Sequence, residues 1–533
     1  MVDILIRNGF VVDGTGRKGQ FADVAVQSGR ILRIEPDMQV EAVRTIDAAG
    51  RVVSPGFIDD HTHGDQFFLF GTDAYNLLEQ GVTTEITGNC GGSIVPYHEG
   101  LLDAVRGMVP DELVEQVRQG TQDFRSFVQL ASRTPTGTNM AFYVGAGNLR
   151  AKVVGFSDAK PTPAQMDEMK ALVAEAMACG FLGLSSGLVY PPSVYADREE
   201  LTELCRVVAA HGGCYVSHIR GECDTVVEAV AEAISIGETA GCDVVVSHHK
   251  IGGKANAGAS AVTLGLIRDA NRRGRIRVLA DQYPFTAGHT ALVSVLDPVF
   301  ATEGVRVLVE KLADPGFRRR VADNLHQPDS QSLIRFSGFD GCLIIGASRT
   351  PDCVGRTIAD IASERHADPT ETLFDLIVDN RGDADAAYFY QNEVDMLAIL
   401  ASPYTMGGSD CGHNVAHFDP ETPGGQHPRA VSTFPKHLRM VRERGLFSLE
   451  EAVRRITLQP ARMVGLADTG VLREGFRADL CVFDWEHVSE TNDYLHPHRR
   501  NLGIDHVLVN GQIAVENGVY TGIRSGAMLW KGK

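Results

Sequence analysis

The stretch Val52-Val-Ser-Pro-Gly-Phe-Ile-Asp-Asp-His-Thr-His63 begins as an apolar, β-prone run, is interrupted by Pro55-Gly56 and ends in His61-x-His63. Side chains two residues apart in a strand point to the same face, so both imidazoles are expected on one side of the strand's C-terminal end. Two neutral imidazoles in that arrangement can hold a divalent metal such as zinc. A pair of surface histidines at a strand end is the alternative, and the rest of the chain decides between the two.

Composition narrows the class of protein. The 533 residues are 44% hydrophobic, enough for a large core, and no window approaches a transmembrane run. A net charge of −18 argues against a nucleic-acid partner or an anionic membrane, because both favour a basic patch. The N-terminus reads as a strand rather than a signal peptide, and the 10 cysteines are scattered without a Cys-x-x-Cys pair. We therefore expect a cytoplasmic protein with reduced thiols that acts on a small molecule.

Strand and helix patterns alternate through the middle of the chain. Amphipathic helices are predicted over residues 163–179, 199–210 and 225–239. The eight predicted strands are residues 52–59, 82–89, 139–145, 180–185, 214–218, 243–247, 277–282 and 404–408. Eight such repeats predict an α/β fold of the (β/α)8 TIM-barrel type, with catalytic groups at the C-terminal ends of the strands. An open doubly wound sheet is the competing architecture, but no Gly-x-Gly-x-x-Gly fingerprint follows the early strands.

The two ends of the chain carry a different pattern. Residues 1–54 and 468–533 alternate short strands with turn signals such as Asn8-Gly9, and neither segment can bury a core alone. We expect them to build one small β-sandwich from both termini, which leaves residues 55–467 for the metal-dependent barrel. Within the barrel, about residues 286–403 are far too long for a connection between strands seven and eight, and they predict an inserted subdomain or lid.

Potential metal ligands follow five of the eight predicted strands. They are His61 and His63 after the first, Cys90 after the second, His218 at the end of the fifth, His248 after the sixth and Asp410 after the eighth. Chance placement of 18 histidines would rarely produce this arrangement. A thiolate with imidazoles suits zinc, and a carboxylate remains for proton transfer. The sequence therefore predicts a metal centre.

The motifs around these residues resemble the amidohydrolase superfamily and, within it, the N-acyl-D-amino-acid deacylases (D-aminoacylases). The motifs general to the superfamily are Pro55-Gly-Phe-Ile-Asp-Asp-His-Thr-His63 and Gly470-Val-Leu-Arg-Glu-Gly-Phe-Arg-Ala-Asp479. The more specific ones are Glu85-Ile-Thr-Gly-Asn-Cys90-Gly and Ser247-His-His-Lys250. Further matches are Ser217-His-Ile-Arg-Gly-Glu222, Asp281-Gln-Tyr-Pro-Phe-Thr-Ala287, Ser409-Asp410 and His427-Pro-Arg429. The resemblance covers nearly the whole chain.

The resemblance implies zinc-dependent hydrolysis of the linear amide bond of N-acyl-D-amino acids, releasing a carboxylic acid and a D-amino acid. It implies that Cys90, His218 and His248 hold a tight zinc ion, and that His61, His63 and Asp410 form a weaker second site, with one or two zinc ions per chain. Asp410 would take a proton from water and pass it to the departing amine nitrogen. The positions that match substrate-carboxylate contacts are Tyr190, Lys250, Tyr283 and Arg429. A packing role is the alternative for Tyr190.

Strand alternation also separates neighbouring side chains. Lys250 shares a face with His248, whereas His249 is expected to point outward into the helical layer. Arg220 shares a face with His218, so it either contacts substrate or pairs with a carboxylate such as Glu222.

Three departures from the family pattern bear on the substrate. Cys411 stands where relatives usually have Gly, Ala146 stands where they often have His, and the loop between Asp410 and Arg429 is longer. Residues 285–300 contain neither Lys nor Arg, and His289 is their only candidate cation. An apolar pocket for the substrate side chain is therefore expected from Leu292, Val293 and Val295, unless these residues pack the inserted subdomain.

The main alternative function is a cyclic-amide hydrolase of the hydantoinase or dihydroorotase type. Those enzymes usually bridge two metals with a carboxylated lysine on strand four, and residues 180–189 contain no lysine. An inactive, barrel-shaped interaction protein would be expected to lose ligands, all of which are present here. The sequence leaves open the physiological substrate and acyl group, the number of metals, the oligomeric state (a homo-oligomer included), and the roles of Cys411 and of the loop 411–426.

Overall fold

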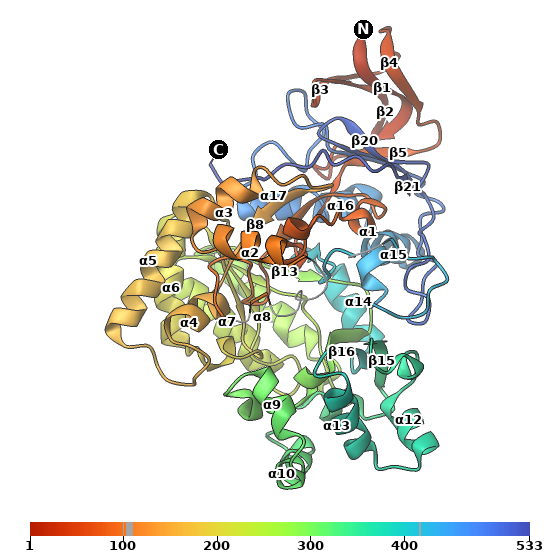
Figure 1. The fold of residues 1–533 in the computed structure, drawn as a ribbon. Coiled ribbons are helices and arrows are strands. Elements are labelled where there is room, and N and C mark those ends of the chain that lie inside the picture. The colour runs from red at the N-terminus through yellow and green to blue at the C-terminus, as the bar shows by residue number, and fades with distance from the viewer. Residues whose placement is uncertain (100, 103–109, 415–416, 533) are drawn as a thin grey trace.

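The computed structural model of the protein describes residues 1–99, 101–102, 110–414 and 417–532. Parallel strands form its centre, in two sheets (Figure 1). The first sheet has the order β6 (Phe57–Asp59), β7 (Val82–Thr87) and β8 (Asn139–Phe142). The second has the order β9 (Val144–Gly145), β10 (Gly183–Gly187), β11 (Cys214–His218), β12 (Asp243–Val246), β13 (Val278–Gln282) and β17 (Thr405–Gly407).

The two parallel sheets approach each other at both ends. Tyr143 alone separates β8 from β9, and its N–H donates to the carbonyl of Thr87 at 2.8 Å. At the other end, the N–H of Asp60 donates to the carbonyl of Gly407 at 3.3 Å. The parallel α/β architecture predicted from the alternation of strands and helices is therefore present, as two sheets rather than one closed sheet.

Helices follow most of these strands. The three predicted over residues 163–179, 199–210 and 225–239 are confirmed within one residue at each end, whereas the similarly long helices 260–273 and 429–444 were not among those predicted. The helices of the central part are α1 (Tyr75–Leu78), α2 (Asp111–Gly120), α3 (Phe124–Ala131), α4 (Ala146–Val153), α5 (Pro163–Cys179), α6 (Arg198–Ala210), α7 (Val226–Ala240), α8 (Ser260–Arg273), α14 (Glu393–Ala401), α15 (Arg429–Arg444), α16 (Leu449–Arg455) and α17 (Leu458–Val464). Local sequence fixes α5: Thr162 and Gln165 form a capping box at its start, and Gly180 ends it with φ of 99°.

The two predicted strands that differ most in extent from the structure do so for local reasons. The expected strand 52–59 is two strands, β5 (Val52–Pro55) and β6, and the chain passes from one sheet to the other at Gly56. The backbone approaches Thr83 so closely there that a Cβ on residue 56 would lie 2.1 Å from its Oγ1. β5 pairs antiparallel with β18 (Leu480–Phe483), whereas β6 pairs with β7. The expected strand 180–185 begins only at Gly183, because residue 180 is the cap of α5.

Strands from both ends of the chain share one nine-stranded sheet. Its path runs β21 (Val519–Tyr520), β20 (Gln512–Glu516), β19 (Ile504–Val509), β18, β5, β1 (Val2–Val11), β2 (Gln20–Gln27) and β3 (Arg30–Glu35), with β4 (Ala42–Asp47) paired to β1. It lies at the top of the view in Figure 1, away from the helices that flank the parallel strands. The N-terminal and C-terminal strands meet at the pairing of β5 with β18.

A separate lobe interrupts the chain between β13 and β17 and lies at the bottom of Figure 1. Its antiparallel sheet has the order β14 (Ala287–Ala291), β16 (Ala384–Phe389) and β15 (Cys342–Ala347). Its helices are α9 (Val305–Lys311), α10 (Pro315–Leu325), α11 (Ile334–Ser337), α12 (Ile358–Arg365) and α13 (Pro369–Asp379). These elements enclose an apolar cluster of their own, so the lobe has its own core.

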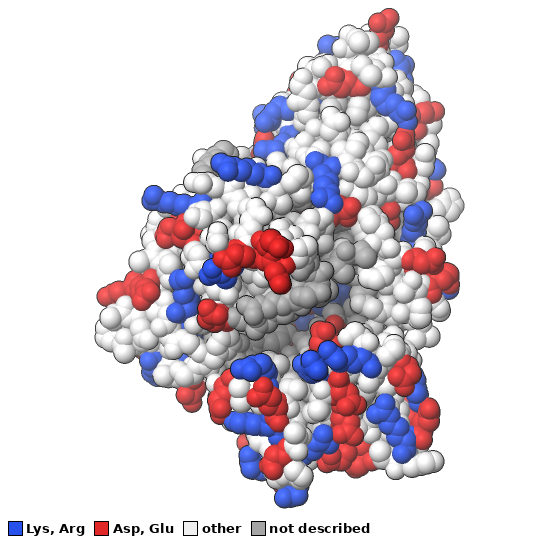
Figure 2. All heavy atoms as spheres, in the orientation of Figure 1, with Lys and Arg blue, Asp and Glu red and all other residues white. Residues whose placement is uncertain are grey.

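Acidic and basic side chains are interspersed on the face drawn in Figure 2, most densely over the inserted lobe. In the part of the chain that the structure describes, no helix combines the length and apolarity needed to cross a bilayer.

Candidate metal centre and substrate pocket

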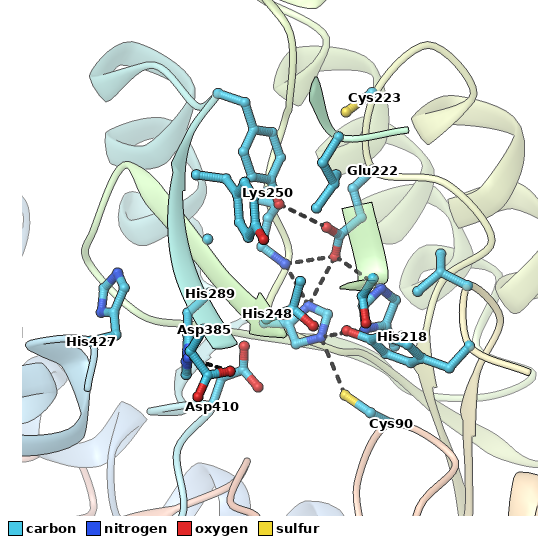
Figure 3. A pocket seen from close by; sticks show the side chains of 18 of the residues that line it. Cys90, His218, Glu222, Cys223, His248, Lys250, His289, Asp385, Asp410 and His427 are labelled. Carbon is cyan, nitrogen blue, oxygen red and sulfur yellow. Dashed lines mark hydrogen bonds and ion pairs between the residues drawn. The ribbon is translucent and has the colours of Figure 1, made fainter. Parts of the chain in front are cut away.

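A cavity of about 1130 Å³ lies between the ends of the parallel strands and the inserted lobe (Figure 3). The lobe supplies residues such as Arg335, Tyr388 and Tyr390 to its wall. Nine of the ten predicted site residues line this cavity, and the tenth, His61, is fully buried. The structure therefore brings the whole predicted set to one place.

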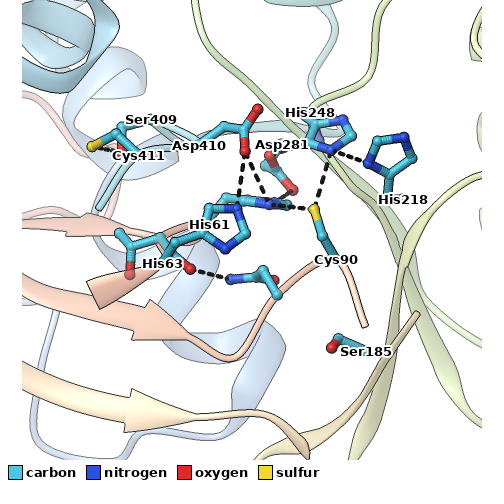
Figure 4. Close-up of polar contacts among 12 residues, drawn as sticks. His61, His63, Cys90, Ser185, His218, His248, Asp281, Ser409, Asp410 and Cys411 are labelled. Carbon is cyan, nitrogen blue, oxygen red and sulfur yellow. Dashed lines mark hydrogen bonds and ion pairs between the residues drawn. The ribbon is translucent and has the colours of Figure 1, made fainter. Parts of the chain in front are cut away.

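The six candidate metal ligands reach this place from the C-terminal ends of five strands. His61 and His63 follow β6, Cys90 follows β7, His218 ends β11, His248 follows β12 and Asp410 follows β17. Their side chains converge in Figure 4. The prediction that His61 and His63 face one side is confirmed, because Nε2 of His63 is 3.2 Å and Nε2 of His61 is 3.6 Å from Oδ1 of Asp410.

The ligand atoms form two clusters that share one thiol. The first consists of His61, His63, Cys90 and Asp410, and the second of Cys90, His218 and His248, with the ligand atoms of each cluster within 4.8 Å of one another. Sγ of Cys90 is 3.3 Å from Nε2 of His61 and 3.4 Å from Nε2 of His248. Nε2 of His248 is in turn 3.0 Å from Nδ1 of His218. Cys90 thus stands where a sulfur could bridge two ions.

Three of these residues have left-handed backbone conformations. The φ angles are 52° at Cys90, 34° at His248 and 53° at Asp410. Positive φ is uncommon for residues other than glycine, and such conformations tend to gather at functional sites. At each position the turn follows a strand end and redirects the side chain toward the cavity.

The charges in the cluster favour the metal-binding protonation states of the thiol and the carboxylate. Burial raises the pKa of the Cys90 thiol, but His61 and His248 outweigh burial and hold that pKa well below its ordinary value. Burial likewise raises the pKa of Asp410, yet Arg429 and His248 hold it well below 3.8. The pKa of His63 is lowered by burial but raised overall to about 9 by Asp410 and Cys90. A thiolate and a carboxylate therefore face imidazoles that would have to lose their protons to bind a cation.

Two further carboxylates, neither of which was predicted to support the metal centre, contact the outer nitrogens of the candidate ligands. Oδ2 of Asp281 is 3.3 Å from Nδ1 of His61, and Oε1 of Glu222 is 3.1 Å from Nδ1 of His248. Carboxylates in this position fix the tautomer and ring orientation of metal-binding histidines. Both residues belong to motifs quoted above, Asp281 at the end of β13 and Glu222 four residues after His218. Membership of these motifs was the sequence signal that could have pointed to a role at the metal centre.

The donor set fits zinc. One thiolate, four imidazoles and one carboxylate converge, and these are the ligand types that zinc accepts in proteins. The inner nitrogens of His218 and His248 point at each other and at the sulfur, and a cation between them would satisfy all three. The outer nitrogens of His61 and His248 already have carboxylate partners, which completes the usual surroundings of such a site.

An arginine occupies the wall beside Asp410. Nη1 of Arg429 is 2.9 Å from Oδ2 of Asp410, and the guanidinium lies 4.6 Å from the ring centroid of Tyr283. Only 4% of the Arg429 side chain is exposed, and among the described residues neither its Nε nor its Nη1 has a hydrogen-bond partner of good geometry. A buried guanidinium with unmet donors is suited to binding a carboxylate through two hydrogen bonds.

Lys250 is already paired with an acid. Its Nζ is 2.6 Å from Oε1 of Glu222 and lies 5.6 Å from the ring centroid of Tyr283, within the cavity wall. Tyr190 lines the same cavity, and its ring centroid is 5.2 Å from that of His218.

Two residues that lie close to candidate ligands in the sequence have partners of their own. His249 turns outward as predicted, since its Nε2 is 2.9 Å from Oγ1 of Thr263 on α8. Arg220 does pair with a carboxylate, but with Glu232 at 3.0 Å rather than with Glu222. It also donates to the carbonyls of Val194 and Ala196.

The departures from the family pattern have mainly structural consequences. Sγ of Cys411 is 2.9 Å from Oγ of Ser409 and lies away from the ligand cluster in Figure 4. Ala146 begins α4 within the main core and does not line the cavity. The long loop packs on the inserted lobe, where His427 donates from Nε2 to the carbonyl of Ala287. Two residues of this loop, 415 and 416, lie outside the described residues.

The expected apolar pocket was assigned to the wrong residues. Leu292, Val293 and Val295 pack in the core of the inserted lobe and do not line the cavity. In their place the lobe presents His289 on β14 and Asp385 on β16, with Nε2 of His289 3.7 Å from Oδ1 of Asp385. The residues from which we predicted an apolar substrate side chain therefore do not support that prediction.

Known proteins are similar to nearly the whole of this chain. Residues 44–515 match the sequence model described as the amidohydrolase family. A D-aminoacylase from Alcaligenes xylosoxydans xylosoxydans is 35% identical over 528 residues, covering 99% of this chain and 97% of that protein. The crystal structure of an N-acyl-D-glutamate deacylase from Bordetella bronchiseptica, complexed with zinc and a phosphonate mimic of the tetrahedral intermediate, is 31% identical, with a TM-score of 0.82 and 99% coverage of both chains. A D-aminoacylase structure described by its binuclear metal centre is 34% identical, with a TM-score of 0.80 and 100% coverage of both.

Proposed function

This chain belongs to the amidohydrolase family, and we propose that it is a zinc-dependent deacylase that cleaves the amide bond of N-acyl-D-amino acids, releasing a carboxylic acid and a D-amino acid. That it is a hydrolase acting on amide bonds follows from the family and from full-length relatives. Selectivity for D-amino acids is supported by those relatives alone.

One observation carries the proposal. Two clusters of zinc-type ligands share Cys90, and a buried guanidinium with unmet donors lies 2.9 Å from the carboxylate of one cluster. This places a site for activating an amide next to a site for binding a carboxylate, and an N-acyl amino acid carries both groups.

We assign a tight zinc site to Cys90, His218 and His248, since these offer the softest ligand and two imidazoles. A weaker second site would use His61, His63 and Asp410, with the Cys90 sulfur shared between the two. One or two zinc ions per chain fit this arrangement, and a relative has a binuclear metal centre.

Asp410 is the residue that we assign to proton transfer. The chemistry that zinc supplies when bound is Lewis acidity toward the amide carbonyl and a lowered pKa of water. Asp410 is ionised at neutral pH, because its pKa lies well below 3.8, and it can therefore accept a proton beside the cluster. Its Oδ1 faces His63 and its Oδ2 faces Arg429, so the carboxylate is held between the metal ligands and the pocket.

Arg429 is the principal cation for the substrate carboxylate in this proposal. Tyr283, against which the guanidinium stacks, limits its orientations. Lys250 and Tyr190 complete the wall, although the charge of Lys250 is partly cancelled by Glu222. Binding the carboxylate here would orient the acyl amide toward the metal ligands.

We further propose that the two parallel sheets are one (β/α)8 barrel over residues 55–467, with an insertion at about 286–403 and a β-sandwich built from residues 1–54 and 468–533. The hydrogen bond from Asp60 to Gly407, which joins β6 to β17, and the single residue Tyr143 between β8 and β9 support this proposal. A cytoplasmic location and a homo-oligomeric state are part of the same proposal, and only the amino-acid composition bears on the location.

The test is a hydrolysis panel with purified, zinc-loaded protein. N-acetyl-D-Leu, -Met, -Phe, -Glu and -Asp would be compared with N-acetyl-L-Leu and with a 5-substituted hydantoin. Hydrolysis of at least one D-substrate with little or none of the L-isomer supports the proposal. Hydantoin opening without deacylation would favour the cyclic-amide alternative. That alternative is less supported, because β10 lacks the lysine that such enzymes place on strand four.

A further inference from the structure

Glu222 lies at the centre of a contact network that the proposed chemistry does not use. It follows β11, and 11% of its side chain is exposed. Oε1 is 2.6 Å from Nζ of Lys250 and 3.1 Å from Nδ1 of His248, and Oε2 accepts from the hydroxyl of Tyr390 at 3.2 Å. Figure 3 shows Glu222 between Lys250, His248 and His218. One carboxylate therefore touches a candidate ligand, a cation and the inserted lobe.

Two groups of opposite kind lie beside Nδ1 of His248. Oε1 of Glu222, at 3.1 Å, can only accept a proton from Nδ1, whereas Nζ of Lys250, at 2.7 Å, can only donate one to it. Nε2 keeps its lone pair for a metal only in the first arrangement, and Glu222 favours that arrangement because it also accepts a hydrogen bond from Lys250. Nε2 is the atom that faces Cys90 and His218, at 3.4 Å and 3.0 Å. Without an acceptor at Nδ1, the ring would be free to hold its proton on the wrong nitrogen or to rotate.

The contact between Glu222 and Lys250 neutralises a positive charge beside the candidate metal site. The ammonium is 2.7 Å from Nδ1 of His248, with only the imidazole between it and the place where a dication would bind. A cation so close to a metal ligand opposes binding of a second cation, and burial strengthens that repulsion. Glu222 cancels this charge at 2.6 Å. A neutral side chain in its place would leave the repulsion uncompensated.

The contact with Tyr390 ties this carboxylate to the inserted lobe. Tyr390 directly follows β16, and its carbonyl accepts from the N–H of Gly253 at 2.7 Å. The carbonyl of Glu222 itself accepts from the N–H of Gly252 at 2.7 Å. Backbone hydrogen bonds thus fix the loop after β12 to both Glu222 and the lobe, and the Tyr390 hydroxyl limits where the carboxylate can move.

We propose that Glu222 is a positioning residue for the metal centre: it orients His248, compensates Lys250 and, through Tyr390, makes zinc binding depend on the inserted lobe. The inference rests on the proposed zinc site but not on the identity of the substrate.

The test measures zinc affinity by competition with a chromogenic chelator, without any substrate. Glu222→Gln removes the charge at nearly constant shape, and a loss of about 10- to 100-fold in zinc affinity is expected, the usual scale for such supporting residues. Tyr390→Phe removes only the hydroxyl, and we expect a smaller loss of about fivefold, since a hydrogen bond contributes ~1 kcal/mol. Both changes should also alter the visible spectrum of the cobalt-substituted protein, which reports ligand geometry.

Glu200→Gln is the matched control. Glu200 forms an equally buried pair with Arg150 at 2.5 Å on α6, outside the cavity. The Glu200→Gln change should destabilise the protein and leave zinc affinity unchanged. Zinc affinity within twofold of wild type in Glu222→Gln, or an equal loss in Glu200→Gln, would overturn the inference. If Glu222→Gln does not fold, unchanged affinity in Tyr390→Phe overturns it. Loss of zinc affinity in a protein without deacylase activity would support the inference while refuting the proposed function.

Discussion

Replacing Asp410 with asparagine tests the proton-transfer role at nearly constant shape. The wild-type carboxylate is 3.2 Å from Nε2 of His63 and 2.9 Å from Nη1 of Arg429. An amide can still accept a hydrogen bond from either partner, but it cannot take up a proton at neutral pH. We therefore expect kcat to fall by about 10²- to 10⁴-fold, the range typical of general acid–base groups.

The same change should be visible in stability. Arg429, with 4% of its side chain exposed, would lose its carboxylate partner, and breaking a buried pair costs about 3–5 kcal/mol. Because the folded-state pKa of Asp410 lies well below 3.8, its contribution is present above about pH 4 and is lost as the pH falls toward that lowered pKa. The difference in unfolding free energy between the metal-free wild type and variant should therefore shrink in acid.

Three measurements decide the outcome: kcat on the best D-substrate, zinc content, and urea unfolding of the metal-free proteins. Glu200→Gln controls for the loss of a buried carboxylate and should keep its kcat. An Asp410→Asn variant with full zinc content and near wild-type kcat would refute the reasoning and assign proton transfer to another group.

The other predictions concern the metal, the substrate and the pH. Cys90→Ala should lose zinc and hydrolysis together, because both clusters contain this thiol; full zinc content by mass spectrometry would contradict the assignment. Arg429→Lys keeps the charge but loses the planar fork, so we expect KM to rise about 10-fold, and an unchanged KM would remove Arg429 from carboxylate binding. Burial raises the pKa of Asp479 from 3.8 to about 6, so stability should fall by up to about 3 kcal/mol between pH 4 and 6; Asp479→Asn should flatten that slope in urea unfolding, and an unchanged slope would assign it to other groups.

The elements that sequence predicted well are those with strong local signals. The predicted helix 163–179 matches α5 because a capping box and a terminal glycine mark both of its ends. Pro55-Gly56 marks an interruption within residues 52–59, but the change of sheet at that point was not predictable from local pattern. Only the side chain of Thr83, distant in sequence, shows that the backbone must approach closely there.

In the site, too, residues with a local sequence signal could be predicted, whereas those that depend on contacts between distant segments could not. The candidate metal ligands could be predicted, because residues of a few ligand types follow the strand ends at which a barrel places its site. The roles of Asp281 and Glu222 could not, because a carboxylate acts there only through a contact that the fold creates. The apolar pocket failed for a related reason: hydrophobicity predicted burial of Leu292 correctly but could not tell a cavity wall from the core of a lobe.

The pairing of β5 with β18 has a consequence for synthesis on the ribosome. Arg51 and Asp505, which pair in the folded protein, are separated by 454 residues. At about 5–20 residues per second, roughly 20 to 90 s pass between their translation. During that interval the edge of β5 has no antiparallel neighbour, and an unpaired edge strand is a site for aggregation. We expect nascent chains stalled before β18 to depend on chaperones, whereas full-length chains can complete the sheet themselves.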